Sequence, residues 1–431
     1  MLKINKLLIT SVLILTQLPL AAQNNTNSPY TRFGYGDLAN RSFGAGRAMG
    51  GIGYGLRSSK QINPMNPASY TAMDSLTFLF DFGVAGQLSW FSQGDGAKQH
   101  DLNGNIEYVA MQFPLHKRIA MSVGILPYSF VGYKFGAVQS DSDKGALYEE
   151  SFSGTGGLND IYVGLSIDIW KKRLAVGANV GYLFGDILHK QDLQVYNEGS
   201  DVYNTYRSQD LEIRDIKLDF GIQYTHPISA TENITLGATF SPSNRLNAKS
   251  YYITQKYQTS GGGEILESDT VTGQKFGIPN EYGVGVSYVK NNKLTVAADF
   301  SYEDWSKALY FSEKGDFRNR IRVAAGAEYI PNYMNKAYFS RIRYRAGVNY
   351  SNSYLRLNRT ETNPKGDSYN EYGVSVGFGL PLVDNRSLIN VSFEYVKKQP
   401  DTKAMMIEEQ YFRFTLNYTF NEFWFFKKKV D

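Results

Sequence analysis

The sequence predicts an all-β fold, a fourteen-stranded antiparallel transmembrane β-barrel, and three observations lead to it. The 431 residues include 32 Tyr, 26 Phe and 41 Gly but no Cys, spread evenly, which indicates one repeating β architecture rather than several domains. Apolar residues alternate with small or polar ones from Leu76 to Phe420. The connections between these alternating runs are short and long in turn. Together these features predict a barrel over residues 74–420.

The length of the runs favours a membrane barrel over a soluble sandwich. After the first 20 residues no apolar run approaches the roughly 18 residues that a membrane helix needs. Many alternating runs reach about ten residues, which is the length of a tilted membrane-crossing strand, whereas strands of soluble sandwiches usually have about five or six. A barrel of this kind has low mean hydropathy because lipid-facing and lumen-facing residues alternate.

The N-terminus reads as a secretory signal peptide over residues 1–22. Lys3 and Lys6 form its basic region, Leu7 to Leu20 its apolar region, and Ala21-Ala22-Gln23 a cleavage site. A retained membrane anchor is the alternative, although the apolar region is short for one. Loss of the two lysines would lower the formal net charge from +4 to +2. The remaining basic residues are scattered, so no nucleic-acid partner is predicted.

Residues 23–73 are predicted to form an N-terminal extension and a hatch, or plug, in the lumen. Between Arg41 and Tyr70 the apolar residues follow neither a helical nor a strand period. The high Gly content marks backbone that needs positive φ or close approach to other structure. Ahead of a large barrel, such irregular backbone is expected inside, where it is shielded from lipid. The candidate hatch residues are Gly44, Gly46, Arg47, Ala48, Gly51, Asn66, Pro67 and Ala68.

This segment also carries a resemblance to a known family. The pattern is Gly44-x-Gly46-Arg47-Ala48-x-x-Gly51, then Asn66-Pro67-Ala68 ahead of the first strand. It resembles the N-terminal hatch of the FadL-type outer-membrane transporters, whose studied members carry long-chain fatty acids and aromatic hydrocarbons. The resemblance covers the hatch and the general layout. It implies fourteen strands, a lateral exit at a kinked third strand, and a place in the outer membrane of a Gram-negative bacterium.

The connections set the number and direction of the strands. The short ones lie near residues 116–118, 171–173, 227–233, 290–293, 331–340 and 381–387. The longer, more polar ones lie near residues 93–102, 136–153, 197–205, 258–275, 310–316, 355–368 and 398–408. Six short and seven long connections make thirteen, and thirteen connections require fourteen strands. Because bacterial barrels place short turns in the periplasm, both ends of the barrel chain are expected there.

The last strand and the tail follow the same scheme. The closing strand ends in the aromatic Phe420, which looks like the signal read by the outer-membrane assembly machinery, a predicted partner during biogenesis. Residues 421–431 form a predicted periplasmic tail with Trp424, Phe425 and Phe426 ahead of three lysines. An interfacial anchor is the favoured interpretation, and a partner-binding tail is the alternative.

The second and third strands depart from simple alternation. Val109, Met111 and Phe113 give the second strand an apolar second face, which we expect to line the lumen. Pro127 lies in the middle of the third strand, where it removes a ladder donor. The sequence therefore predicts a kink or gap in the wall, which is either a tolerated bulge or a lateral opening for an apolar ligand.

Charged residues on the later strands are expected to face the lumen. They are Asp299, Arg320, Arg322, Glu328, Arg343, Arg345, Glu394 and Arg413, with Glu303 and Glu371 beside them. A charge at membrane depth is costly unless it is paired or hydrated. One interpretation is a pairing network that fills the barrel and holds the hatch, with Arg47 docked onto it. The other is that some of the arginines bind the carboxylate of an acidic amphiphile.

Little in the sequence points to catalysis. The four His residues are isolated, and there is no metal-binding spacing and no G-x-S-x-G sequence, so no catalytic residue, metal or cofactor is predicted. A barrel hydrolase remains the alternative.

The predicted function is passive transport of hydrophobic small molecules, such as fatty-acid-like amphiphiles, through a hatch-gated barrel surrounded by outer-membrane lipid. The alternative is a non-transporting FadL-like barrel, a scaffold or shuttle subunit of a secretion or assembly complex with other outer-membrane proteins. A sealed lumen would favour that alternative.

Overall fold

The structure is a computed structural model. It describes residues 26–94, 96, 98–141, 146–196, 203–258, 264–314, 317–357, 360, 363–382, 386–402 and 407–423. The predicted signal peptide and tail residues 424–431 lie outside the described residues. Within these ranges, none of the helices combines the length and the apolar character that crossing a membrane requires.

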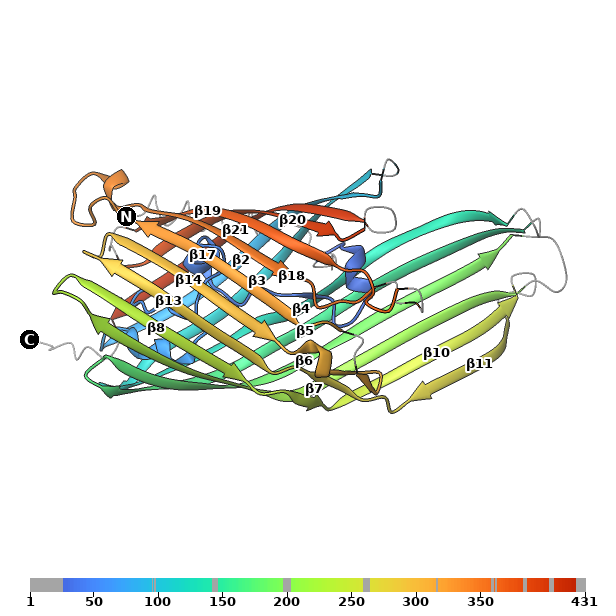
Figure 1. The fold of residues 1–431 in the computed structure, drawn as a ribbon, viewed down its shortest axis with the longest axis horizontal. Helices are drawn as coiled ribbons and strands as arrows, with labels where there is room; N and C mark the ends of the chain where they lie inside the picture. The colour runs from blue at the N-terminus through green and yellow to red at the C-terminus, as the bar shows by residue number, and fades with distance from the viewer. Residues whose placement is uncertain are drawn as a thin grey trace, which may run out of the picture.

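The fold is a closed barrel of fourteen antiparallel strands, as the sequence predicted (Figure 1). The strands are β2 (Thr77–Ser92), β3 (Lys98–His116), β4 (Ile119–Asp141), β5 (Ala146–Trp170), β6 (Leu174–Val195), β7 (Asn204–Pro227), β8 (Glu232–Ser241), β13 (Glu281–Lys290), β14 (Leu294–Glu303), β17 (Arg320–Tyr329), β18 (Arg343–Asn352), β19 (Tyr369–Pro381), β20 (Leu388–Pro400) and β21 (Glu408–Phe423). Pairing of β21 with β2 over sixteen residues of each strand closes the ring.

One side of the barrel is taller than the other. Beyond β8 the chain continues as β9 (Asn244–Leu246) and β10 (Ala248–Gln258), and it returns through β11 (Glu264–Thr272) and β12 (Phe276–Ile278) to β13. β10 pairs with the N-terminal half of β7, from Asn204 to Ile213, and with β11. With the long strands β4 to β7, these form a sheet that extends beyond the rest of the barrel, to the right in Figure 1. We call this the long-loop end, and the opposite end, with the short connections, the turn end.

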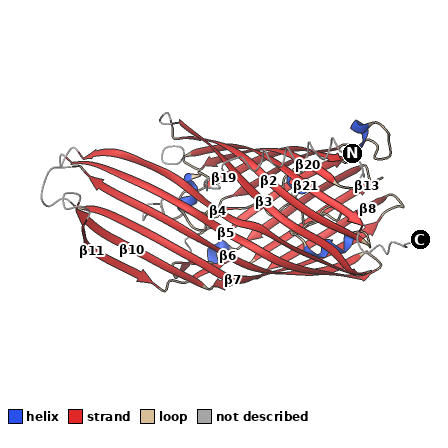
Figure 2. Ribbon diagram, turned by 180° about the vertical axis from the view of Figure 1, so that it is seen from behind, coloured by secondary structure: helices blue, strands red, loops and turns tan. Residues whose placement is uncertain are grey.

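The remaining elements are short, and they lie inside the barrel or at its ends (Figure 2). They are η1 (Pro29–Arg32), β1 (Asp37–Leu38), α2 (Gly44–Arg47), η2 (Pro67–Ala72), η4 (Trp305–Lys307), β15 (Leu309–Tyr310), β16 (Glu313–Lys314) and η5 (Tyr338–Arg341). On the outside, alternate residues of the wall are exposed and apolar, among them Val180, Phe300 and Val374. This is the pattern of a surface that faces lipid.

An aromatic cluster closes the long-loop end of the interior. Tyr35 of the N-terminal segment packs against Trp305, Phe317 and Tyr310, and Tyr354 covers Trp305 with ring centroids 4.5 Å apart. Trp305 and Tyr35 are completely buried. Burial raises the pKa of the Tyr35 hydroxyl, so it stays neutral and donates a hydrogen bond to the carbonyl of Gly277 at 3.0 Å. Neighbouring aromatic rings in such arrangements stabilise a core beyond the area they bury.

Candidate functional site in the barrel interior

Residues 26–73, which we call the N-terminal segment, contact inward-facing groups around the barrel wall. Its first part lies at the long-loop end, where Thr31 Oγ1 donates to the carbonyl of Gly132 in β4. Its last part lies towards the turn end, where Ser166 Oγ of β5 donates to the carbonyl of Ala68 at 3.0 Å. The first described residues thus lie at the long-loop end of the lumen. The first barrel strand, β2, begins at the turn end, and the last one, β21, finishes there.

Glycines in the wall allow the backbone of the N-terminal segment to lie directly against the strands. A Cβ at Gly347 of β18 would come within 2.1 Å of the Met49 carbonyl carbon, and one at Gly237 of β8 within 1.9 Å of the Tyr54 carbonyl oxygen. Real Cβ atoms do not approach backbone this closely, so both positions exclude any larger residue. Close backbone approach is one of the structural uses of glycine.

Arg47, a predicted hatch residue, docks onto β3. Its Nη2 lies 2.6 Å from Glu107 Oε2, and it also donates to the carbonyl of Asn40 at 2.9 Å. The two charged side chains are only 2% and 1% exposed. The expectation that Arg47 contacts the charged wall of the later strands is therefore wrong. The reason is that α2 lies against β19, β20 and β21, and from there the Arg47 side chain reaches the buried carboxylate of Glu107 on β3.

Two charges of the later strands bind the backbone of the N-terminal segment rather than each other. Asp299 Oδ2 on β14 accepts hydrogen bonds from the amides of Gly53 and Tyr54 at 2.6 and 2.9 Å. Arg322 on β17 donates to the carbonyls of Gly50 and Gly51 at 2.6 and 3.1 Å. Charge-assisted hydrogen bonds of this kind are stronger than neutral ones. They fix the Gly-rich stretch against two neighbouring strands, β14 and β17.

The other predicted lumen charges make contacts within the wall. Glu328 lies between Arg343 at 2.9 Å and Arg345 at 2.7 Å. Arg320 pairs with Glu303 at 2.9 Å. Arg413 donates to Gln87 Oε1 at 3.0 Å, and its Cα partner on β20 is Glu394, whose side chain is buried. Arg320, Arg343 and Arg345 are thus paired with carboxylates of the wall, whereas Arg413 contacts the neutral amide of Gln87.

A further buried charge cluster on the earlier strands was missed by the sequence reasoning. Arg41 Nη2 lies 2.8 Å from Asp219 of β7 and 3.5 Å from Asp160 of β5, and Lys217 also pairs with Asp219. Burial alone would lower the pKa of the Arg41 guanidinium, but the two carboxylates raise it well above its ordinary value. The alternation of β5 and β7 places Asp160 and Asp219 on the inward face, and this signal could have identified them.

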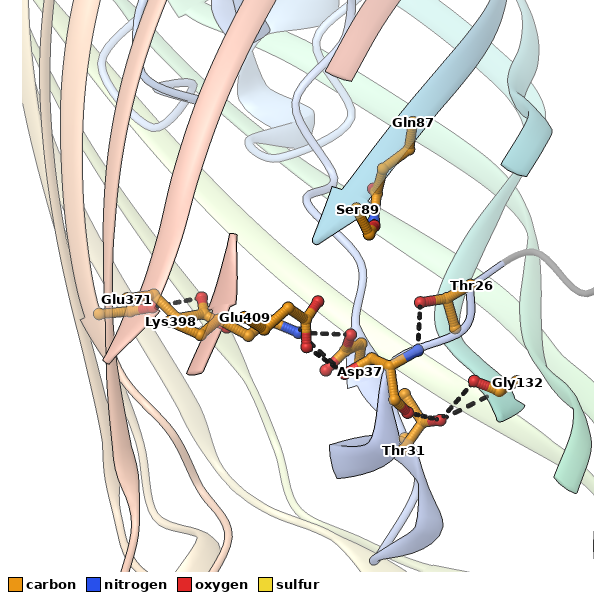
Figure 3. Close-up of polar contacts among 12 residues, drawn as sticks. Thr26, Thr31, Asp37, Gln87, Ser89, Gly132, Glu371, Lys398 and Glu409 are labelled. Atoms are coloured by element: carbon orange, nitrogen blue, oxygen red, sulfur yellow. Dashed lines mark hydrogen bonds and ion pairs between the residues drawn. The ribbon is translucent and has the colours of Figure 1, made fainter. Parts of the chain in front are cut away.

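A second missed cluster ties the start of the chain to the wall (Figure 3). Lys398 Nζ of β20 lies 2.7 Å from Asp37 Oδ2 and 3.2 Å from Glu409 Oε1 of β21. Its side chain is 3% exposed. Ser28 Oγ donates to the other carboxylate oxygen of Glu409. Lys398 was assigned to a long loop in the sequence, so its burial was not foreseen.

The ladder between β3 and β4 breaks at the place where the sequence predicted a kink. The two strands pair from His116 and Ile119 up to Val109 and Ile125, and no further in the described residues. Pro127 follows two residues later, and β4 continues to pair with β5 on its other side, with a register shift at Tyr128.

β1 takes the place of β3 beyond this break. Leu38 and Asp37 pair antiparallel with Ser129 and Phe130, and the Ala39 amide donates to the carbonyl of Tyr128 at 2.9 Å. The unpaired edge of β4 is therefore covered by the N-terminal segment next to Pro127. The pairing with β1 extends over Ser129 and Phe130 of this edge.

The prediction that Val109, Met111 and Phe113 line the lumen is wrong. Met111 is 41% exposed on the outer face. The inward positions are Tyr108, which stacks on Phe43 at 3.5 Å, and Gln112, which donates to the carbonyl of Tyr70. A register shift opposite Gly83 leaves Glu107 without a partner in β2. Such a bulge changes which residues face inward, and the sequence pattern does not show it.

The lumen holds more than one space beside the N-terminal segment. A space of about 560 Å³ lies towards the turn end, lined by Leu56, Arg57 and residues of β8 and β13. A cavity of about 130 Å³ lies beside the N-terminal segment. Ten of its 26 lining residues are charged, among them Arg41, Arg320, Arg322, Glu371, Glu394 and Arg413. Sites for drug-sized ligands usually measure about 300–1,000 Å³ and are mostly apolar. The cavity suits water or a small ion and does not suit an acyl chain. In the described part of the chain, no group of three His, Asp or Glu side chains is placed to hold a metal ion.

Comparison with known proteins gives a family and a set of structures with the same fold. A family model with the description BamG matches residues 1–431. A search of curated proteins finds no match. The monoaromatic hydrocarbon channel CymD is 14% identical, over 89% of this chain and 98% of its own, with a TM-score of 0.57.

Two further solved structures agree with this likeness. A FadL homologue of Pseudomonas aeruginosa is 14% identical over 89% of this chain and 99% of its own, with a TM-score of 0.57. The Pseudomonas putida toluene transporter TodX is 14% identical over 90% and 99%, with a TM-score of 0.56. Similarity at this level shows the fold alone, which is that of the FadL-type barrels. By name, CymD is a channel and TodX a transporter.

Proposed function

The chain belongs to the BamG family, and on that premise we propose that it is a closed barrel subunit of an outer-membrane assembly complex. The prefix of the family name points to outer-membrane assembly. The FadL-type fold supports a location in the outer membrane of a Gram-negative bacterium, with the short turns on the periplasmic side.

The observation that carries this proposal is the set of buried polar contacts that bind the N-terminal segment to the barrel wall. Ion pairs and charge-assisted hydrogen bonds join the N-terminal segment to β3, β7, β14, β17 and β20. The aromatic cluster around Trp305 packs at the long-loop end of the interior, and the cavity beside Arg41 and Arg322 measures about 130 Å³. A conduit for hydrophobic molecules needs an apolar path of the width of its cargo, and the charged lining of this cavity does not provide one.

Passive transport of hydrophobic small molecules is the second candidate, and the break between β3 and β4 favours it. The ladder is interrupted beside Pro127, and only β1 covers the edge of β4 there. Displacement of β1 would expose the lumen to the membrane side. The channel neighbours share this fold, so a barrel of this architecture can contain a route of this kind.

Native mass spectrometry of the protein extracted from its own membrane separates the two functions. A structural subunit is expected to leave the membrane with other proteins in fixed stoichiometry and with no small molecule bound inside. The opposite result, a lone barrel that carries a hydrophobic molecule, would contradict the proposal and support transport. The Lys398→Met variant, which loosens Asp37, is a suitable control because it tests whether any bound molecule enters past β1.

A further inference from the structure

The connection between β17 and β18 differs from the other connections at the turn end. The turns after β3, β5 and β13 are two or three residues long and polar. The β17–β18 connection spans residues 330–342, contains η5, and exposes four large apolar side chains. Met334 is 78% and Phe339 74% exposed, and Tyr333 and Tyr338 are exposed to a lesser degree. Exposed apolar clusters usually mark an interaction surface.

Internal hydrogen bonds hold this connection in a defined shape. The Asn332 amide donates to the carbonyl of Ser340 at 2.7 Å, which closes the loop at its base. The side chain of Asn332 accepts from the Met334 amide, and that of Asn335 accepts from the Ala337 amide at 2.9 Å. Met334 and Phe339 therefore point into solvent because a structured loop places them there.

The exposed side chains continue the lipid-facing surface of the barrel. The hydroxyl of Tyr344, on the outer face of β18, donates to the carbonyl of Phe339 at 3.2 Å. The Tyr344 ring meets Phe378 edge to face, and its partner across the ladder is the exposed Tyr329. η5 projects beyond the outline of the barrel at the turn end (Figures 1 and 2). The loop thus lies next to the rim of the wall.

The charge of the loop is of one sign. Residues 331–342 contain Lys336 and Arg341 and no Asp or Glu. The Arg341 guanidinium lies 5.5 Å from the centroid of the Tyr338 ring. Aromatic residues mixed with basic ones are typical of segments at the membrane–water interface, where anionic lipids attract the cations.

From these features we propose that residues 331–342 form a docking site for the phospholipid surface of the adjoining leaflet. Met334 and Phe339 insert between the lipid headgroups, and Lys336 and Arg341 contact their phosphates. A second protein is the competing occupant. Lipid is favoured because the apolar surface is continuous with the lipid-facing wall and because the loop carries only positive charge. This inference holds whether the barrel transports or acts as a subunit.

Spin labelling tests the proposal directly, since the chain has no cysteine of its own. Single-cysteine variants at Met334 and Phe339 are labelled in the full-length protein and reconstituted into bilayers of phosphatidylethanolamine and phosphatidylglycerol. A label at Asn292 in the polar β13–β14 turn serves as the aqueous control, and one at Val376 on the outer face of β19 as the lipid control. Power saturation then compares access of oxygen and of a water-soluble nickel complex.

The proposal requires the labels at positions 334 and 339 to shift towards oxygen access, as at position 376. Nickel access equal to that at position 292 would overturn it. Labels that are water-exposed in pure bilayers but shielded from both reagents in native outer-membrane vesicles would show that a protein covers the loop, and would also overturn it.

Charge variants provide a second measurement that does not depend on the apolar residues. Lys336→Glu combined with Arg341→Glu is expected to shift the label at position 339 towards water in bilayers with phosphatidylglycerol. Lys336→Gln with Arg341→Gln should give a smaller shift. If the position of the label is the same for all three proteins, the cations do not contact lipid and the proposal fails in that part.

Discussion

At the scale of single residues, the interior is governed by buried charges that depend on one or two partners each. Arg47 and Glu107 show this most clearly, because both side chains are almost completely buried and lie 2.6 Å apart. Removal of one member of such a pair leaves the other uncompensated, which costs much more than the pair itself contributes.

We therefore expect Arg47→Ala to lower the free energy of unfolding by about 3–5 kcal/mol. The double variant Arg47→Ala with Glu107→Gln should recover most of the loss, because no unpaired charge remains. Urea unfolding in detergent micelles, followed by tryptophan fluorescence, measures both. Equal stability of the single variant and the wild type would show that Glu107 is hydrated and that the interior at α2 is wet.

The sequence could place many of these residues but not their partners. Strict alternation assigns Asp299, Arg322 and Glu328 to the inner face, and the structure has them there. It cannot reveal that Asp299 binds peptide amides, because the partner backbone is irregular. It also fails at Glu107, where one extra residue reverses the faces of β3 and turns Val109, Met111 and Phe113 outward.

At the scale of elements, β1 is the segment that decides whether the wall is continuous. It contributes only two paired residues, Asp37 and Leu38, yet it covers the edge that β4 exposes beside Pro127. Pro127 in the sequence indicated an interruption. It did not indicate what fills it, because two residues are too few to produce a strand period.

A disulfide between β1 and β4 should lock this element. Leu38 and Ser129 face each other in a pair that exchanges no hydrogen bond, since the neighbouring Ala39 amide bonds to Tyr128. Side chains of such pairs lie close enough for a disulfide. We expect Leu38→Cys with Ser129→Cys to oxidise spontaneously to an intramolecular bond that is visible as a mobility shift lost on reduction.

The two candidate functions predict different consequences of this disulfide. A structural subunit retains its partners and its activity in assembly whether the disulfide is oxidised or reduced. If oxidation stops uptake of a hydrophobic compound and reduction restores it, β1 is a gate and the transport candidate is correct. Formation of no disulfide at all would mean that β1 does not lie on β4 in the membrane.

At the scale of the whole molecule, the barrel and the N-terminal segment are joined by complementary charged groups. The wall supplies Glu107, Asp160, Asp219 and Asp299, and the segment supplies Arg41, Arg47 and backbone amides. The number of strands follows from the spacing of turns and loops in the sequence. The path of the segment does not, because it is set by contacts between residues far apart in the chain.

Deletion of residues 41–70 should leave a folded barrel with a water-filled lumen. The carboxylates that lose their partners would then be hydrated, and single-channel conductance in planar bilayers is expected to rise well above that of the intact protein. A folded deletion variant, verified by circular dichroism, whose conductance equals that of the intact protein would show that these residues do not obstruct the lumen.

The sixteen-residue ladder between β2 and β21 has a consequence for the order in which the protein folds. A segment bonded to strands on all sides of the lumen cannot be threaded into a finished ring, so it has to be in position while the two terminal strands are still apart. We therefore expect Arg47, Asp299 and Lys398 to form their contacts before the last ladder does, with the N-terminal segment as a template for the remaining strands.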